Sequence, residues 1–127
     1  MPLFDGTPFT SHSGLQLPFK INCDALTKED WDCIAKIVAA KYKFCRVWGI
    51  PKGGTPFANA LRPYIDPTSD DELVADDVLT TGRSMEDFKR KWEPLCGRLF
   101  GVVLFRRTQV HIDWIVPVFD LNPKFAD

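Results

Sequence analysis

The sequence lacks an excess of either charge and lacks any long run of apolar residues. Its 127 residues include 16 basic and 17 acidic side chains, which are spread along the chain and give a formal net charge of -1. This balance offers no basic surface for nucleic acid or for an anionic membrane, so we expect neither partner. No stretch reaches the roughly 18 consecutive apolar residues that a membrane-spanning helix needs.

Signals for export and for metal binding by cysteine are also missing. The N-terminal residues lack the basic and apolar regions of a signal peptide, so we expect a cytoplasmic protein. The cysteines form no CxxC pair and no Cys/His cluster with metal-binding spacing. We interpret them as buried free thiols: Cys23, Cys33, Cys45 and Cys96.

The sequence does contain enough apolar material for one hydrophobic core, with 45% hydrophobic residues and 13% aromatic residues. Together with the length, this predicts a single domain over residues 1–127. Residues 1–24 hold several prolines and glycines among isolated hydrophobic residues. They predict an irregular N-terminal arm with one extended piece over residues 17–23.

Helices are predicted where apolar residues recur at helical spacing after a capping signal. Thr27 with Asp30, and Ser84 with Asp87, resemble capping boxes at the start of two such segments. A third helix is expected after a proline. The predicted helices span residues 27–43, 56–62 and 84–95.

Short apolar runs between these helices predict strands that are covered on both faces. The runs span residues 44–50, 73–79, 99–105 and 114–119. Their alternation with helices indicates an α/β fold of three layers, with a mostly parallel central sheet flanked by helices. Sheets of this kind bind ligands in the loops at the carboxyl ends of their strands, which is where chemistry is expected.

The strongest functional motif follows the predicted strand over residues 73–79. Backbone N–H groups at the start of the next helix, with hydroxyl groups beside them, form a cradle suited to a phosphate dianion, and a glycine permits close approach. The cradle residues are Thr80, Thr81, Gly82, Arg83 and Ser84. Asp76 and Asp77 come just before the cradle, and two adjacent carboxylates suit the cis hydroxyls of a ribose.

A second motif, Lys52-Gly53-Gly54-Thr55, ends the predicted strand over residues 44–50. The glycines let the backbone turn its N–H groups toward a ligand, Lys52 adds a positive charge, and Thr55 can cap the next helix. A sharp turn that needs glycine for its shape alone is the alternative. The motif is not a Walker A loop, because no Gly-Lys-Ser/Thr ending is present.

The segment from Glu72 to Ser84 resembles the phosphoribosyl pyrophosphate signature of type I phosphoribosyltransferases, in which paired acids precede a Thr-Thr-Gly-x-Ser loop. The resemblance implies that Asp76 and Asp77 are catalytic and hold the ribose, and that residues 80–84 hold its 5-phosphate. It implies that residues 52–54 hold pyrophosphate, in a loop that commonly contains a non-proline cis peptide bond. We expect both acids to be solvated in an open site.

The N-terminal arm narrows the resemblance, because residues 9–14 and 18–22 look like the base-covering arm of orotate phosphoribosyltransferases. In that subfamily a lysine usually stands at the position of His12 and an aromatic residue near that of Lys20. Arg106 follows a strand where those enzymes carry an arginine that meets the carboxylate of the base, which implies Arg106 and Lys20 as base contacts. Arg107 is adjacent, so either arginine can point toward the pocket.

The chain departs from the family pattern between the two loops. Family members place there a further strand and a long mobile loop that closes over the substrate, whereas here only residues 62–71 remain. Two functions therefore stay open. One is transfer of a phosphoribosyl group from phosphoribosyl pyrophosphate to an orotate-like base, which we favour, and the other is non-catalytic nucleotide binding as a module or subunit.

The resemblance also implies Mg2+ as a cofactor that arrives on the pyrophosphate of the substrate. Protein side chains alone form no metal site, and Asp76 and Asp77 would reach the ion only through the ligand. A homodimer or a protein partner is compatible with four tryptophans, some of which can lie in an interface.

Overall fold

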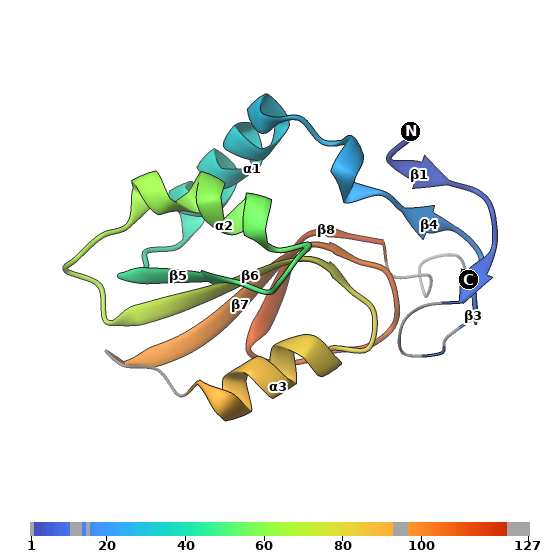
Figure 1. The fold of residues 1–127 in the computed structure, drawn as a ribbon. Helices are drawn as coiled ribbons and strands as arrows, with labels where there is room; N and C mark the ends of the chain where they lie inside the picture. Colours follow the sequence, from blue (N-terminus) through green and yellow to red (C-terminus); the bar gives the residue numbers. More distant parts are fainter. Residues whose placement is uncertain (1, 11–13, 15, 93–96, 122–127) are drawn as a thin grey trace.

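The computed structural model describes residues 2–10, 14, 16–92 and 97–121. A four-stranded sheet forms its centre, and every neighbouring pair of strands in it is parallel (Figure 1). The strands follow the order β5 (Arg46–Gly49), β6 (Asp71–Leu79), β7 (Arg98–Arg106) and β8 (Ile115–Asp120). These ranges match the four predicted apolar runs, and the parallel arrangement confirms the predicted α/β class.

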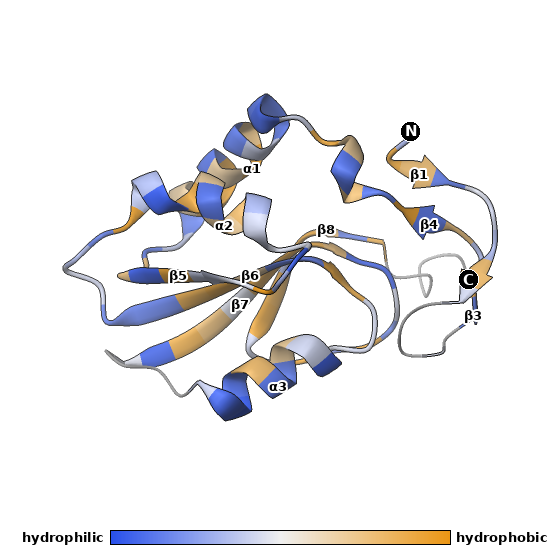
Figure 2. Ribbon diagram, in the orientation of Figure 1, coloured by the Kyte–Doolittle hydropathy of each residue, from blue (hydrophilic) through white to orange (hydrophobic). Residues whose placement is uncertain are grey.

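Helices cover both faces of the sheet and make the predicted three layers. The helices α1 (Lys28–Lys41) and α2 (Thr55–Leu61) lie on one face, and α3 (Arg83–Lys91) lies on the other (Figure 1). Hydrophobic residues gather on the central strands, and the exposed sides of the helices are hydrophilic (Figure 2). Because successive strand residues point to opposite faces, each strand supplies two separate cores.

The first helix begins as the sequence predicts. The backbone N–H of Asp30 donates to Thr27 Oγ1 at 3.1 Å, and the N–H of Thr27 donates to Asp30 Oδ2 at 2.9 Å. This capping box satisfies two N–H groups that the helix cannot pair internally. The buried side of α1 then packs on α2, where the rings of Trp31 and Phe57 lie 5.2 Å apart.

The third helix differs from its prediction at both ends. Its N-cap is Gly82, with a φ of 83°, and Ser84 lies inside the first turn with no side-chain cap. A left-handed backbone is the conformation that glycine adopts without steric cost, so glycine rather than serine ends the preceding loop. The helix ends at Lys91, with Trp92 as its C-cap, and residues 93–96 lie outside the described residues.

The short connection between α2 and β6 contains the 3-10 turn η2 (Arg62–Tyr64) and then runs to the amino ends of the strands. The N–H of Asp66 donates to the carbonyl of Phe44 at 2.8 Å, and Ser69 Oγ donates to the carbonyl of Lys43 at 3.3 Å. Both acceptors precede β5. The connection is therefore tied to the amino ends of the strands, away from the loops at their carboxyl ends.

The N-terminal arm is more ordered than predicted. Two antiparallel strand pairs form within it, instead of one extended piece. They are β1 (Phe4–Asp5) with β4 (Lys20–Ile21), and β2 (Phe9–Thr10) with β3 (Gln16–Leu17). A 3-10 turn, η1 (Cys23–Ala25), leads to α1. The ring of Phe4 lies 5.5 Å from that of Phe105 and docks the arm on β7.

The free-thiol interpretation is right for only part of the cysteines. Cys23 and Cys33 are free thiols, but Cys33 is exposed. Burial, together with the nearby carboxylates of Asp77, Asp24 and Asp76, raises the pKa of Cys23 to about 12. The interpretation is wrong for Cys45, which forms a disulfide. Cys96 lies outside the described residues.

No helix among the described residues is both long enough and apolar enough to cross a membrane.

Gly101 gives a test of the packing between the sheet and α3. A Cβ atom at this position of β7 would lie 2.5 Å from Met85 Cε and 3.1 Å from Ile115 Cγ1. We predict that Gly101→Val lowers the free energy of unfolding by about 1–3 kcal/mol, because overpacking a tight core forces side chains from their rotamers. Urea denaturation measures this change.

Gly6→Val is the matched control, since a Cβ atom there meets nothing within 4 Å. An equal loss of stability in both variants would contradict the described packing of α3 on β7.

Candidate functional site

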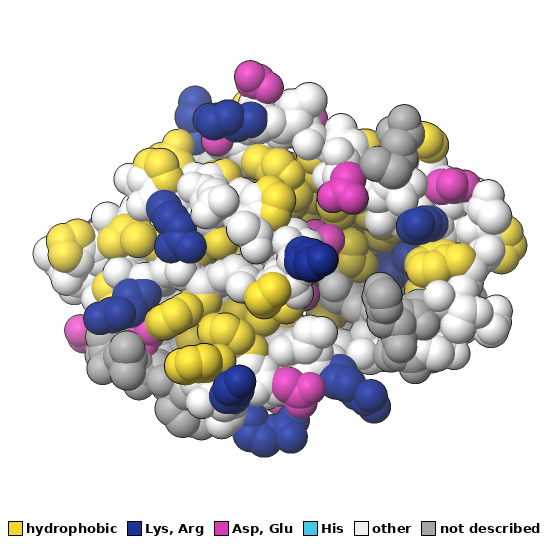
Figure 3. All heavy atoms as spheres, in the orientation of Figure 1, with side chains coloured by type: hydrophobic (Ala, Val, Ile, Leu, Met, Phe, Trp, Pro, Cys, Tyr) yellow, Lys and Arg dark blue, Asp and Glu magenta, His cyan; other side chains and the backbone are white. Residues whose placement is uncertain are grey.

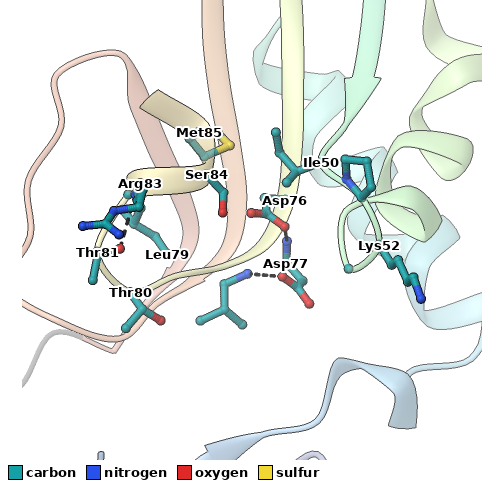
Figure 4. Close-up of a pocket in the computed structure, with 14 residues that line it drawn as sticks. Ile50, Lys52, Asp76, Asp77, Leu79, Thr80, Thr81, Arg83, Ser84 and Met85 are labelled. Carbon is teal, nitrogen blue, oxygen red and sulfur yellow. Dashed lines mark hydrogen bonds between the residues drawn. The ribbon is translucent and has the colours of Figure 1, made fainter. Parts of the chain in front are cut away.

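The two motifs singled out in the sequence meet at one cavity of about 710 Å3, at the carboxyl ends of β5 and β6 (Figure 4). Its lining contains Asp76, Asp77, Lys52, Gly53 and all five residues of the predicted phosphate cradle. Gly54 is buried behind the loop and does not line the cavity. Adjacent parallel strands end at the same edge, which brings together loops that are distant in the sequence.

The Lys52 loop packs directly against the acid pair. A Cβ atom on Gly53 would lie only 2.4 Å from Asp77 Oδ2, so no larger residue fits without moving the carboxylate. Gly54 donates its N–H to the carbonyl of Ile50 at 2.8 Å, and a Cβ atom there would lie 2.3 Å from the carbonyl oxygen of Ala75. Here glycine is required for close approach of two backbones.

The peptide bond between Pro51 and Lys52 is cis. A non-proline cis bond in this loop is what the resemblance implied.

The two acids differ in their surroundings. They are consecutive residues of β6 and therefore point to opposite faces of the sheet. Asp76 is 9% exposed, and its Oδ1 accepts the N–H of Asp77 at 2.8 Å. Asp77 is half-buried beside Gly53, and its Oδ1 accepts the N–H of Val78 at 2.8 Å.

Burial controls the charge of Asp76. Loss of solvent around its carboxyl group, with the negative charge of Asp77 as a smaller cause, raises the pKa of Asp76 to about 8. Asp76 is therefore largely protonated at neutral pH. The expectation that both acids are solvated is wrong for Asp76, because the strand that presents it is covered by α3 on that face.

The phosphate cradle is a tight turn that leads into α3. The N–H of Arg83 lies 3.3 Å from Thr81 Oγ1, and the N–H of Glu86 donates to the carbonyl of Gly82 at 2.9 Å. Thr108 Oγ1 donates to the carbonyl of Thr80 at 2.6 Å and attaches the turn to the segment after β7. The remaining amides of the first turn point outward at the positive end of the helix.

Side chains around the cradle lie as Figure 4 shows. Ser84 points toward Asp76, whereas the guanidinium of Arg83 points away from the acids. Lys52 is exposed and lies on the opposite wall of the cavity, with its side chain directed away from the acids. The cavity thus has two acids at its centre, a hydroxyl-rich turn on one side and a cation on the other.

The predicted base contacts do not line this cavity. Arg106 is ion-paired with Asp120, with its Nε 3.1 Å from Asp120 Oδ1, and its Nη1 lies 3.5 Å from the carbonyl of Val110. Lys20 is exposed on the arm, opposite Asp5 in the β1–β4 pair. His12 lies outside the described residues.

Arg107, the alternative that the sequence left open, does not line this cavity either, but its surroundings differ from those of Arg106. It is 6% exposed, and its guanidinium lies 4.3 Å from the ring centre of Phe19 and 5.5 Å from that of Phe9. One Nη donates to the carbonyl of Phe19, but Nε has no acceptor in the described part of the chain. Burial lowers the pKa of Arg107.

Arg107 also lies close to the cradle, because its N–H donates to the carbonyl of Leu79 at 3.2 Å. A buried guanidinium with an unpaired N–H group favours an anionic ligand, since desolvated charge without a partner is costly. The sequence offered only one signal for this residue, namely its position directly after a buried strand.

The hydrogen-bonding groups of the site fit a sugar phosphate. Outward amides and hydroxyl groups suit a tetrahedral anion, and carboxyl oxygens suit the hydroxyl groups of a ribose. Within the described residues, no group of three or more His, Cys, Asp or Glu side chains is arranged to hold a metal ion.

Comparison of the fold with solved structures finds clear similarity over nearly the whole chain. An orotate phosphoribosyltransferase from Aeropyrum pernix has a TM-score of 0.71 at 20% identity, covering 94% of this chain and 88% of that one. The chain has the type I phosphoribosyltransferase fold. No family model matches the sequence, and no curated protein matches it.

Two further phosphoribosyltransferases show the same similarity. Orotate phosphoribosyltransferase from Mycobacterium tuberculosis H37Rv, in complex with inorganic phosphate, has a TM-score of 0.66 at 16% identity, covering 92% of this chain and 88% of that one. Adenine phosphoribosyltransferase from Leishmania donovani has a TM-score of 0.65 at 10% identity, covering 93% of this chain and 76% of that one.

The raised pKa of Asp76 predicts that stability falls with rising pH. Below about pH 4 the carboxyl group is protonated in both folded and unfolded chains, so its pKa shift has no effect. Between about pH 4 and 8 only the folded chain keeps the proton, and stability is lost progressively until pH exceeds the folded pKa.

Asp76→Asn should therefore be increasingly more stable than wild type as pH rises across this interval, by up to about 1.4 kcal/mol per pH unit. Urea denaturation at several pH values measures the difference. Asp70→Asn, at an exposed position near the amino ends of the strands, corrects for the loss of one acidic side chain. A difference between Asp76→Asn and wild type that does not change with pH would contradict the burial of this carboxyl group.

Proposed function

We propose that this protein binds phosphoribosyl pyrophosphate and transfers its phosphoribosyl group to an orotate-like base, with release of pyrophosphate. One observation carries the proposal: the Lys52 loop and the acid pair, predicted separately from the sequence, touch at Gly53 and Asp77 in one cavity. Sugar, phosphate and pyrophosphate need three adjacent subsites, and this cavity offers the groups for each.

The 5-phosphate would lie in the turn of residues 80–84, where the amides at the start of α3 and nearby hydroxyl groups face a dianion. The Mycobacterium tuberculosis relative was obtained in complex with inorganic phosphate, which supports a phosphate site in this fold. The ribose hydroxyls would donate to Asp76 and Asp77. Pyrophosphate would face Lys52 and the backbone of Gly53 across the cavity.

Mg2+ fits this site only when a ligand brings it. The side chains supply two adjacent carboxyl groups, which is too few for a closed protein site, but substrate oxygens and water commonly complete the coordination of this ion. When bound with pyrophosphate, the ion would neutralise part of the leaving group's charge.

Arg107 rather than Arg106 is the better candidate for the base. Arg106 already has a carboxylate partner in Asp120, whereas Arg107 is buried under the arm with an unpaired Nε. A carboxylate on the base would pair with the planar guanidinium in a bidentate manner. The rings of Phe9 and Phe19 add an aromatic surface on the same side.

The chain's own residues would act mainly by positioning. As the bond from C1 of the ribose to pyrophosphate breaks and the bond to a base nitrogen forms, positive charge develops on the sugar, and the carboxyl group of Asp77 beside the ribose would stabilise it. No described segment closes over the cavity, because the connection from η2 to β6 lies at the amino ends of the strands. Turnover should therefore be slow, since a lid normally excludes water.

The missing lid favours a second candidate function, which is nucleotide binding without catalysis. Besides Lys52 and Arg83, no cationic side chain in the described part of the chain lines the cavity. Incubation with phosphoribosyl pyrophosphate, Mg2+ and a panel of bases separates the two functions. Base-dependent release of pyrophosphate supports the transferase, and binding without release supports the binding protein.

Asp77→Asn should weaken the binding of phosphoribosyl pyrophosphate more than about tenfold, because hydrogen bonds to a charged group are worth about 1.5–3 kcal/mol. Isothermal titration calorimetry in Mg2+ measures the affinity. Asp70→Asn serves as the control and should bind as wild type does. If wild type shows no binding, or if Asp77→Asn binds equally well, the proposed ligand is wrong.

Arg107→Lys should weaken the binding of orotidine 5′-monophosphate more than about tenfold, since an ammonium group cannot make the bidentate contact of a guanidinium. Arg106→Lys is the matched control and should change the affinity less than about twofold, because its partner is Asp120. Calorimetry gives the affinities without requiring turnover, and melting curves check that both variants fold. A larger effect at Arg106 would reverse the assignment.

A further inference from the structure

Strand β5 forms one edge of the sheet. It pairs with β6 along Arg46–Gly49, and no described strand pairs with its other side. An edge strand of this kind presents free backbone groups to any strand that can approach it.

The opposite edge strand, β8, differs from β5 in containing a proline. Strand β8 contains Pro117, which cannot donate a backbone hydrogen bond, and it ends at the acidic Asp120. Proline and charged residues are common means of keeping edge strands from pairing. Strand β5 contains no proline, and its one charged residue is Arg46.

The backbone of Val47 faces the open edge. Its carbonyl accepts a hydrogen bond from Nη1 of Arg62 at 3.3 Å, so it points away from β6. Because the N–H and C=O of one strand residue point to the same side, the N–H of Val47 also faces outward. The carbonyl oxygen has a second lone pair that a strand N–H can use.

Three side chains on this edge, Arg46, Trp48 and Trp92, form a row of one cationic and two aromatic groups. Arg46 and Trp48 are two residues apart and therefore project on the same face, the one that carries α3. The ring of Trp48 stacks on that of Trp92, with centres 6.3 Å apart and an angle of 19° between the planes. Trp92 is 50% exposed, and Arg46 is exposed with no acidic partner among the described residues.

The surface around this row is visible in Figure 3, where hydrophobic side chains gather between β5 and α3 with Lys and Arg beside them. An exposed apolar patch with aromatic residues and arginine is typical of a protein interface.

We propose that β5 is a homodimer interface, in which it pairs antiparallel with β5 of a second copy about a two-fold axis at Val47. In this register the outward N–H and C=O of the two Val47 residues bond to each other. Arg46 of each chain then lies opposite Trp48 of the other, so that two cation–π contacts form across the axis. The row is complementary to itself, which is the requirement for a two-fold interface.

The proposed dimer leaves both cavities accessible. Each cavity lies at the carboxyl end of its own β5, and antiparallel pairing carries the two carboxyl ends in opposite directions. The dimer therefore stands independently of the proposed function, and monomeric variants should bind phosphoribosyl pyrophosphate as wild type does.

Size-exclusion chromatography with light scattering tests the oligomeric state. Wild type should have twice the 14.5 kDa mass of one chain. Arg46→Glu and Trp92→Ser should each raise the dimer dissociation constant more than about tenfold, since Arg46 makes the cation–π contact across the axis and Trp92 supports the Trp48 ring that receives it. Phe119→Ser is the matched control, because Phe119 is 45% exposed on the opposite edge strand, and it should remain dimeric.

Melting curves check that each variant is folded. Wild type that stays monomeric at all concentrations overturns the proposal, as does a dimer that Phe119→Ser dissociates and Arg46→Glu does not.

Hydrogen exchange measured by mass spectrometry gives a second readout that needs no substitution. Peptides covering Arg46–Gly49 should exchange more slowly as the protein concentration rises, because dimerisation pairs the outward amides. Concentration-dependent protection of β8, with none in β5, would place the interface at the other edge and overturn the proposal.

Discussion

The candidate site depends on the close approach of two backbones at the carboxyl ends of β5 and β6. Gly53 lies against the carboxylate of Asp77, and Gly54 lies against the carbonyl of Ala75. A side chain at either glycine would separate the Lys52 loop from the acid pair, and the cavity between them would lose one wall. Parallel pairing of β5 with β6 sets this approach, because it places Gly49, the last residue of β5, beside Ala75, directly before the acid pair.

The same geometry creates an electrostatic imbalance in the empty protein. Asp76 and Asp77 are consecutive residues, and the carboxyl group of Asp76 has almost no contact with solvent. This burial raises the pKa of Asp76 far above that of an ordinary aspartate. On the other side of the cradle, Arg107 is buried without an acid, and its pKa is lowered. Such groups reduce the stability of a fold, and their retention is typical of sites that recognise ligands.

The fold of solved phosphoribosyltransferases extends over nearly all of this chain, including the strands and loops that form the candidate site. The connection from α2 to β6 is bonded to residues before β5, at the amino ends of the strands and away from the cavity. Among the described strands, β5 is at one edge of the sheet. The edge of β5 and the cavity are separate features, so a second chain would meet the edge without closing the cavity.

The sequence by itself determined the elements and the ligand loops. Apolar runs predicted all four strands of the sheet within about three residues, and the capping box of Thr27 and Asp30 started α1 where expected, since these signals are local. The cradle of residues 80–84 was likewise readable, because a phosphate site at a helix start requires a few residue types in a fixed order.

Only the tertiary structure decided how side chains share space. The sequence could not separate Arg106 from Arg107, because their opposite orientations depend on the pairing of β7 with β8 and on the arm that covers one of them. It gave no sign that Asp76 is buried and Asp77 is not, since the alternation along β6 has meaning only once α3 covers one face. Burial, and with it charge, arises from contacts between segments that are far apart in the chain.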